Sequence, residues 1–503
     1  MLKDKVLSRI MYDQSQFTPL NWIGPNSLYL SEGAYAESRL ISGYAPDEWI
    51  TYTQNIPESF WFGAYTEDAL EGESDYGLKN FSDPVFVKKF EQDVGESYQK
   101  VVSLRDRYFS TFYQKEKEMI DTQSIQVEIF LKDVQKVNQY IVARYLLTQP
   151  QRFSGIEREL QKEGPNKDIE IISKNGRKPT FITELRLAIV NYALLVSKSR
   201  ATDEDYFSLL SIADKLGFLN WGFLGGELLD SQHIDQEVSN LVSDKKKLLE
   251  EKNKLDELIS NINKRNNLLK NKKDRIWLLA DIMGQGSVFR FDLQTLLLCT
   301  MKYVDNLLVQ IRDKHSLTKE EFDSYEFNEQ CNLISGGLMV DKQLLESRQR
   351  GYLRVYKHSG VETYIGEKAH KEIDSLLDYR KKEISQVRDL RGTVASFPDK
   401  EKPILIGTAF VLTTAFGSED LIQSMRPGEI LVATQTHPNL VPKMKEALAI
   451  VTDEGGVTCH AAIVSRELSK PCIVGTRFAT KVIKTGDKIK IDLNTGTVVV
   501  LPT

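Results

Sequence analysis

The chain has few cysteines and no long apolar run. Its 503 residues include four cysteines, Cys299, Cys331, Cys459 and Cys472, and none of them forms a CxxC pair. So few thiols in so long a chain exclude a disulfide framework. The longest apolar stretches, such as "FLNWGFLGGELL", are shorter than a membrane span, and the N-terminal "MLKDKVLSRIMYDQSQ" has no apolar core of signal-peptide length. These features predict a cytoplasmic protein.

An excess of charge of one sign is also lacking. The chain has 66 Lys and Arg against 71 Asp and Glu, a formal net charge of −5 at pH 7. This balance gives no reason to expect a nucleic-acid or membrane partner. Charged residues make up 27% and hydrophobic residues 41%, which is ordinary for a globular protein. The length is too great for one core and predicts two to four domains.

The first 385 residues have mostly helical patterns. Residues 1–80 are rich in aromatics, proline and glycine, which predicts an irregular entry segment. From 84 to 150 apolar residues recur at helical spacing. Short amphipathic helices are predicted over 317–385, with turn signals at "ISGGLM" and "KHSGVE". A predominantly α-helical region is therefore expected over 1–385.

Residues 240–275 predict a long charged helix. Apolar residues recur there seven apart, which hints at a coiled coil, but the matching second positions of the heptad are mostly charged. A long antiparallel helix lying on a helical body is the preferred interpretation. The heptad positions are Leu241, Leu248, Leu255, Ile262 and Leu269, with Asp244, Glu251, Leu258, Arg265 and Lys272 as the second set.

The pattern changes near residue 388. Short β-rich runs such as "GEILVATQT", "ALAIVTDEGG" and "DKIKIDL" alternate with glycine, and one clear helix, "HAAIVSREL", lies among them. The stretch "IDLNTGTVVV" predicts a closing hairpin. Residues 388–503 are therefore predicted to form an α/β domain, which the charged segment "DYRKKEISQVRDLRG" joins to the helical region.

His460 stands out within this α/β domain. The double glycine Gly455-Gly456 lets the backbone turn sharply and leaves its amide N–H groups uncovered, and Thr458 offers a hydroxyl. Ala461 and the small residues after it predict a helix that begins at this point. A histidine at a helix N-terminus suits an imidazole that becomes negatively charged by carrying a phosphoryl group.

Other roles for His460 are less favoured. Cys459 suggests a Cys–His nucleophile pair, but adjacent residues point to different sides of a helical turn. A zinc site is disfavoured because no second His or Cys lies at ligand spacing. His437, in "TQTHPNLVP", is interpreted as a solvated loop histidine, with a second catalytic role as the alternative. Arg348, Arg350 and Arg354 are interpreted as solvated, with phosphate contact as the alternative.

The string "TDEGGVTCHAAIVSREL", followed by "IVGT", resembles the phosphohistidine, or swivelling, domain of the phosphoenolpyruvate-utilising enzymes. That family includes phosphoenolpyruvate synthase, pyruvate phosphate dikinase and the rifampicin phosphotransferases. The resemblance extends over about 388–501. It implies that His460 is the phosphorylated residue, that Thr458 hydrogen-bonds to its phosphoryl group, and that Gly455 and Gly456 support this group. Arg466 matches an arginine of the family motif, and its alternative is a helix-surface residue.

The resemblance also implies a division of labour. The family's fused enzymes carry a nucleotide-binding ATP-grasp domain and a phosphoenolpyruvate-binding barrel, and neither is expected in this sequence. The chain is therefore expected to be one subunit of a split phosphotransferase. A separate ATP-grasp partner would hold ATP with Mg²⁺ and phosphorylate His460 from the β-phosphate, and residues 1–385 would bind a small-molecule acceptor and dock the partner. The alternative is a phosphohistidine carrier or regulatory protein with no small-molecule acceptor of its own.

Overall fold

The computed structural model describes most of the chain after residue 66 and three short segments before it. The described residues are 9–13, 48–54, 58–64, 67–148, 150–164, 166–222, 230–357, 360–372, 390–399, 401–412, 422–436, 440–453, 459–476 and 478–501. Within these residues, no helix is both long enough and apolar enough to cross a membrane.

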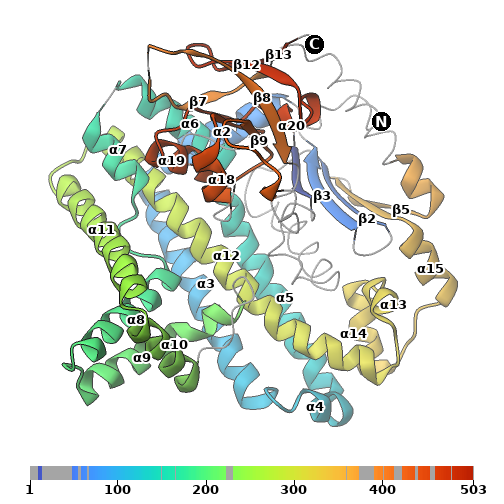
Figure 1. The fold of residues 1–503 in the computed structure, drawn as a ribbon. Coiled ribbons are helices and arrows are strands. Elements are labelled where there is room, and N and C mark those ends of the chain that lie inside the picture. Colours follow the sequence, from blue (N-terminus) through green and yellow to red (C-terminus); the bar gives the residue numbers. More distant parts are fainter. Residues whose placement is uncertain are drawn as a thin grey trace.

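A helical body accounts for most of the described chain up to residue 350 (Figure 1). Its centre is the 40-residue helix α12, Arg275–Lys314, which packs against α3, α4, α5, α6, α7 and α9. Because α12 is surrounded by other helices, most of its apolar residues lie in the body's core. The other helices are α2 (Glu67–Phe81), α3 (Pro84–Thr111), α4 (Glu116–Thr122), α5 (Ser124–Leu147), α6 (Pro150–Lys162), α7 (Lys167–Lys174), α8 (Phe181–Ser197), α9 (Asp203–Gly222), α10 (Ser231–Ser243), α11 (Lys245–Leu269), α13 (Lys319–Asp323), α14 (Phe327–Gly336) and α15 (Lys342–Arg350).

The predicted long charged helix is present as α11. It packs against α7, α8 and α10, and it buries Leu248 and Ile262 against its neighbours. A long charged helix that lies on the helical body is therefore present, and its antiparallel direction stays a prediction. It is shorter than predicted, because α10 ends at Ser243 and Asp244 then caps α11 by accepting from the N–H of Lys247 at 3.0 Å.

A five-stranded antiparallel sheet in the body was not predicted. Its order is β1-β3-β2-β4-β5, from β1 (Arg9–Asp13), β2 (Glu48–Gln54), β3 (Glu58–Ala64), β4 (Tyr352–Lys357) and β5 (Gly360–Ile365). The irregular entry segment expected over 1–80 is thus wrong for β1, β2 and β3 and for most of α2. The helices expected over 317–385 are wrong for β4 and β5. The turn signal "KHSGVE" joins two strands, and "YLRVYK" alternates as a strand does.

A buried carboxylate on α12, that of Asp292, binds the first residue of helix α8. Thr180 caps α8 by accepting from the N–H of Thr183 at 3.3 Å, and Asp292 accepts from the N–H of Phe181 at 3.1 Å. Asp292 is only 1% exposed. Burial raises its pKa from 3.8 to about 7, with a small contribution from Glu184, while the Phe181 hydrogen bond and the charge of Lys178 act in the opposite direction.

Asp292→Asn is expected to flatten the pH dependence of stability. In the wild-type chain the folded state keeps a proton that the unfolded state releases, so the free energy of unfolding falls as the pH rises from 3.8 to about 7. The asparagine has no such proton, and its side-chain oxygen still accepts from Phe181. Urea unfolding at a series of pH values measures the difference. Asp313→Asn, at an exposed position of α12, is the control, and parallel curves for the two variants would contradict the expectation.

The C-terminal part of the chain forms an eight-stranded mixed sheet. The order is β6-β13-β12-β8-β9-β10-β11-β7, and the neighbours from β8 through β11 are parallel, whereas the other pairs are antiparallel. The strands are β6 (Leu390–Arg391), β7 (Thr393–Ser396), β8 (Ile404–Leu412), β9 (Ile430–Ala433), β10 (Ala449–Thr452), β11 (Cys472–Val474), β12 (Lys488–Asp492) and β13 (Thr497–Val500), with helices α18 (Val441–Glu446), α19 (His460–Glu467) and α20 (Ala479–Val482). The expected α/β character and the closing hairpin of β12 and β13 are confirmed.

The body and the C-terminal sheet have separate apolar cores. The buried cluster of the body runs from Phe81 to Tyr352, and the two clusters of the C-terminal part take all their members from Leu390 onwards. A domain with its own core can change its position without unfolding. The predicted boundary between 385 and 388 lies outside the described residues, so the limits of the two predicted domains stay a prediction.

Candidate functional site

His460 lies where a central parallel strand ends and a helix begins. Strand β10 is buried along its whole length between β9 and β11. Further along the chain, Cys459 is the N-cap residue of α19. The first residue of α19 is His460, so the predicted helix N-terminus is confirmed. The carboxyl ends of parallel strands are common places for ligands, and the free N–H groups of a helix N-terminus favour an anion.

Three predicted site residues lie outside the described part of the chain. Gly455, Gly456 and Thr458 belong to residues 454–458, between β10 and α19, and His437 also falls outside the described residues. Their roles stay predictions. The structure places His460 by its backbone, at the first position of α19.

The segment that leads from β10 towards His460 is anchored by a buried aspartate. Asp453 is 5% exposed, and its N–H donates to the carbonyl of Ala433 on β9 at 3.0 Å. Its carboxylate accepts from the N–H of Thr480 at 2.9 Å and from the Thr480 hydroxyl. Thr476 donates its N–H and its hydroxyl to the carbonyl of Thr452, both at 3.0 Å. These bonds hold the end of β10 to the chain around α20.

Asp453 belongs to the string "TDEGGVTCHAAIVSREL", but the sequence alone indicates no role for it. Burial raises the pKa of Asp453 above its ordinary value, and its hydrogen bonds to Thr480 act in the opposite direction. An aspartate directly after a buried strand, with a Thr 27 residues later, offers no pattern that a reader of the sequence could recognise. We interpret Asp453 as a positioning residue, because it fixes where the loop before His460 begins.

Small residues bring α19 close to the sheet. Ala461 is 2% and Ala462 0% exposed, and both belong to a core with Ile450 of β10 and Cys472 of β11. The helix packs against β7, β10 and β11. Larger side chains at these two positions would push α19 away from the sheet and move its N-terminus. The small-residue run after His460 therefore sets the position of the helix start.

Arg466 lies in the last turn of α19. Its Nε donates to the carbonyl of Ala395 on β7 at 2.9 Å, and the residue is half-buried. The pKa of Glu170 on α7 is lowered, first by a hydrogen bond from Lys174 and in smaller part by the charge of Arg466. The bond to Ala395 secures α19 to the sheet. Its predicted support of a phosphoryl group stays a prediction.

The thiol beside His460 is a poor nucleophile. Cys459 caps α19 without a side-chain hydrogen bond, and burial raises the pKa of its thiol, although the N–H groups of Ala461 and Ala462 act in the opposite direction. All four cysteines are free, and burial raises the pKa of Cys299, Cys331 and Cys472 to about 12. These findings support the interpretation that gave Cys459 no chemistry.

One of the three arginines that were interpreted as solvated is buried. Arg348 is 7% exposed and donates to Glu329 at 2.6 Å and to the carbonyl of Ser324 at 3.0 Å. The interpretation is wrong for this residue, because its partner lies 19 residues upstream and the sequence does not show the contact. Arg350 is exposed at the end of α15. Across the described residues, no group of three or more His, Cys, Asp or Glu side chains could hold a metal ion.

The fold and the site agree with the comparison to protein families. Residues 425–496 match the family described as PEP-utilising enzyme, mobile domain. The predicted resemblance is therefore confirmed for this part of the chain, which carries a mobile domain of the phosphoenolpyruvate-utilising enzymes. The matched residues span β9, α18, β10, α19, β11, α20 and β12, so they include α19 and the strands β10 and β11 on which it packs, but not β7.

Several similar proteins are described as phosphoenolpyruvate synthases. A probable phosphoenolpyruvate synthase of Archaeoglobus fulgidus is 58% identical over 81 residues, which cover 16% of this chain and 11% of that protein. The phosphoenolpyruvate synthase of Pyrococcus furiosus is 54% identical over 93 residues (18% and 11%), and a probable one of Pyrococcus abyssi 35% over 169 residues (32% and 20%). The matched regions thus span at most 20% of the length of these relatives.

Among solved structures, a chain of Thermococcus kodakaraensis aconitase X in its holo-form is similar over 23% of this chain and 98% of that chain. The sequence identity is 17% and the TM-score is 0.19, which is too low to establish a shared fold.

Proposed function

We propose that this chain is the phosphohistidine subunit of a split phosphotransferase. His460 accepts a phosphoryl group from the β-phosphate of ATP, which is bound with Mg²⁺ on a separate ATP-grasp partner. The mobile domain then presents the group to a small-molecule acceptor on the helical body. The observation that carries the proposal is the position of His460, at the first residue of α19 and at the carboxyl end of a buried parallel strand, inside a matched mobile domain.

Each transfer step makes one bond to phosphorus and breaks another. The unprotonated imidazole nitrogen of His460 attacks the β-phosphorus, an N–P bond forms, and the bond to the α-phosphate oxygen breaks, so AMP leaves. Water then releases the terminal phosphate as inorganic phosphate. In the transfer to the acceptor, which follows, the hydroxyl oxygen of the acceptor attacks the phosphorus bound to His460. The N–P bond breaks, and the hydroxyl proton passes to water. The Mg²⁺ on the partner neutralises the charge of the phosphates.

Three features of the described residues support this role. The N-terminus of α19 favours the negative charge that a phosphohistidine carries. Asp453 holds the end of β10 to α20 through Thr480, so the strand end that precedes the His460 segment has a fixed position. The mobile domain has its own apolar cores, which suits a unit that moves between two sites.

The alternative function is a phosphohistidine carrier without an acceptor of its own. The two functions differ in the fate of the phosphoryl group. A carrier hands it to another protein, whereas the proposed transferase hands it to a small molecule on the body. The size of the helical body, which is more than a carrier needs, favours the transferase.

The test is phosphorylation of the purified chain, followed by intact mass and acid lability. The chain is incubated with Mg²⁺-ATP alone, with Mg²⁺-ATP and the ATP-grasp protein encoded nearest to it, and with phosphoenolpyruvate. We expect an acid-labile phosphoryl group only with the ATP-grasp protein. Phosphorylation by the isolated chain would overturn the split arrangement. An unphosphorylated chain in all three incubations would overturn the phosphohistidine role itself.

A further inference from the structure

A cavity of about 440 Å³ lies in the helical body where α11 ends and α12 begins. Its walls come from segments that are far apart in the sequence: the start of α3, the loop between α7 and α8, the end of α11, the turn after it, and the first two turns of α12. The volume is within the range of sites for small molecules. The cavity is distant in sequence from His460, and its described lining residues all belong to the helical body.

The lining of this cavity is strongly basic. Its described residues include Arg177, Arg265, Lys270, Lys272 and Lys273, and a single carboxylate, that of Asp281. Two further carboxylates pair with these cations from outside the lining: Glu91 with Arg177 at 2.8 Å, and Asp168 with Lys272 at 2.9 Å. An excess of two positive charges is left after all three carboxylates are counted. Such an excess in one concave site attracts an anion.

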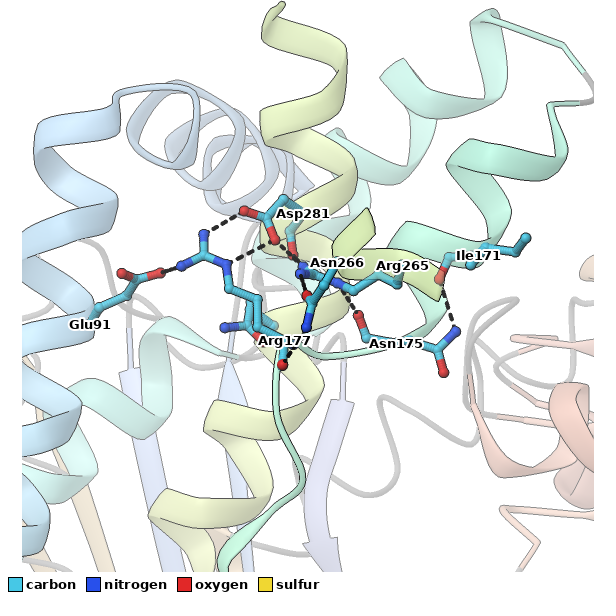
Figure 2. Close-up of polar contacts among 8 residues, drawn as sticks. Glu91, Ile171, Asn175, Arg177, Arg265, Asn266 and Asp281 are labelled. Carbon is cyan, nitrogen blue, oxygen red and sulfur yellow. Dashed lines mark hydrogen bonds and ion pairs between the residues drawn. The ribbon is translucent and has the colours of Figure 1, made fainter. Parts of the chain in front are cut away.

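The arginines of the lining are held in place before any ligand arrives. Figure 2 shows Arg177 and Arg265 converging on Asp281, with Glu91 on the far side of Arg177. Arg265 is 1% exposed, and its Nε donates to the carbonyl of Asn175 at 2.9 Å. Because their positions are fixed by these contacts, little conformational entropy is lost when an anion binds beside them.

Two further basic residues of the lining, Lys270 and Lys273, lie in the turn between α11 and α12. Lys270 and Lys273 are exposed, and the ion pairs found among the described residues involve neither of them. Their long side chains can reach an anion at the mouth of the cavity. They supply the excess positive charge, because Asp281 and Glu91 neutralise Arg177 and Arg265, and Asp168 neutralises Lys272.

One wall of the cavity is apolar. Trp277, Leu269, Leu278 and Pro84 belong to the lining, and the ammonium of Lys272 lies 3.5 Å from the centre of the Trp277 ring. A ligand that filled this site would therefore place an apolar or aromatic group beside Trp277 and an anionic group beside the arginines and lysines. Both halves of the site lie within the same 440 Å³.

We propose that the α11–α12 cavity binds a phosphate ester with an apolar or aromatic body. The phosphate is held by Lys270 and Lys273 beside Arg177 and Arg265, and the organic part packs on Trp277 and Leu278. Phosphate is preferred over a carboxylate because its double negative charge matches the excess of two positive charges in the lining.

Helix α7 reaches this cavity at its C-terminal end, because Asn175, directly after α7, accepts from Arg265 of the cavity at 2.9 Å. As a deepening that rests on the proposed function, the cavity is the place where the phosphorylated product is held. Binding of the ester by itself does not require His460.

The test is isothermal titration calorimetry of the full chain with three probes: naphthyl phosphate, inorganic phosphate and naphthol. We expect naphthyl phosphate to bind more tightly than inorganic phosphate, naphthol to show no binding, and added salt to weaken the binding of the ester. The double variant Lys270→Gln/Lys273→Gln is expected to bind the ester about tenfold more weakly, because two charge-assisted contacts are lost. Equal affinity for ester and inorganic phosphate would overturn the ester assignment.

The matched control is Lys254→Gln/Lys264→Gln, which removes the same charge from exposed positions of α11 outside the lining. Its affinity for the ester should equal that of the wild type, and equal losses in both double variants would overturn the site. The His460→Ala chain separates the cavity from the proposed function, since it should bind the ester normally. Ester binding by a wild-type chain that none of the three incubations phosphorylates would reject the function and leave the cavity standing.

Discussion

His460→Ala is expected to abolish phosphorylation of this chain and every transfer that depends on it. The reaction needs a neutral ring nitrogen that attacks phosphorus and later leaves it more readily than an alkoxide would. Alanine has no nucleophile, and the adjacent Cys459 thiol is a poor substitute, because burial raises its pKa. The fold should be retained, since the position is the first residue of α19 and alanine is well tolerated in a helix.

Two neighbouring substitutions are the controls for this experiment. Thr458→Val removes one expected hydrogen bond to the phosphoryl group, so about 1–3 kcal/mol and a tenfold to hundredfold loss of rate are expected. Cys459→Ser should be nearly silent. All three variants are compared by intact mass and acid lability after incubation with the phosphoryl donor. A phosphorylated His460→Ala chain, or a Cys459→Ser chain that takes up no phosphate, would contradict the mechanism.

The mobile domain was the part of the fold that its sequence described best. Its strands are short, buried and separated by glycines, and the run "HAAIVSREL" has the period of a helix. These signals are local, because each is complete within about ten residues. The helix start at His460 and the β12–β13 hairpin could therefore be predicted without knowing what packs against them.

The five-stranded sheet of the body could not be predicted in the same way. Strand β2 pairs with β4, which lies about 300 residues further along the chain. Each strand alone is a short alternating segment, and "YLRVYK" or "EWITYTQ" could belong to a strand, a helix end or a loop. The distant strand that pairs with such a segment determines whether it forms a strand, and the segment's own sequence does not identify that partner.

The polar contacts that matter at both sites are equally non-local. Asp453 accepts a hydrogen bond from Thr480. Asp281 forms ion pairs with Arg177 and Arg265, and these three residues come from three separate segments of the body. In the sequence these residues are ordinary charges on helix faces or loops. Their burial is what gives them a role, because a charge in a protein interior requires a partner whereas a solvated one does not. Charge counts along the chain therefore could not reveal the basic cavity.

Asp281→Ala is expected to destabilise the helical body by about 3–5 kcal/mol. The carboxylate pairs with Arg177 and Arg265, and Arg265 is 1% exposed. Loss of the carboxylate therefore leaves the buried guanidinium of Arg265 without its counter-ion. Urea unfolding followed by far-UV circular dichroism measures the effect. This signal reports the body, because the described helices of the mobile domain have only six, eight and four residues.

Asp256→Asn is the matched control, because Asp256 is 55% exposed and pairs with Lys252 one turn away on α11. It should cost about 0.5 kcal/mol or less. A second variant separates the missing charge from a packing defect: in Asp281→Leu/Arg265→Met both members of the buried pair become apolar, so most of the stability should return. If Asp281→Ala costs no more than the control, the ion network does not hold α7, α11 and α12 together. If the double variant is as unstable as Asp281→Ala, the loss comes from packing and not from an unpaired buried charge.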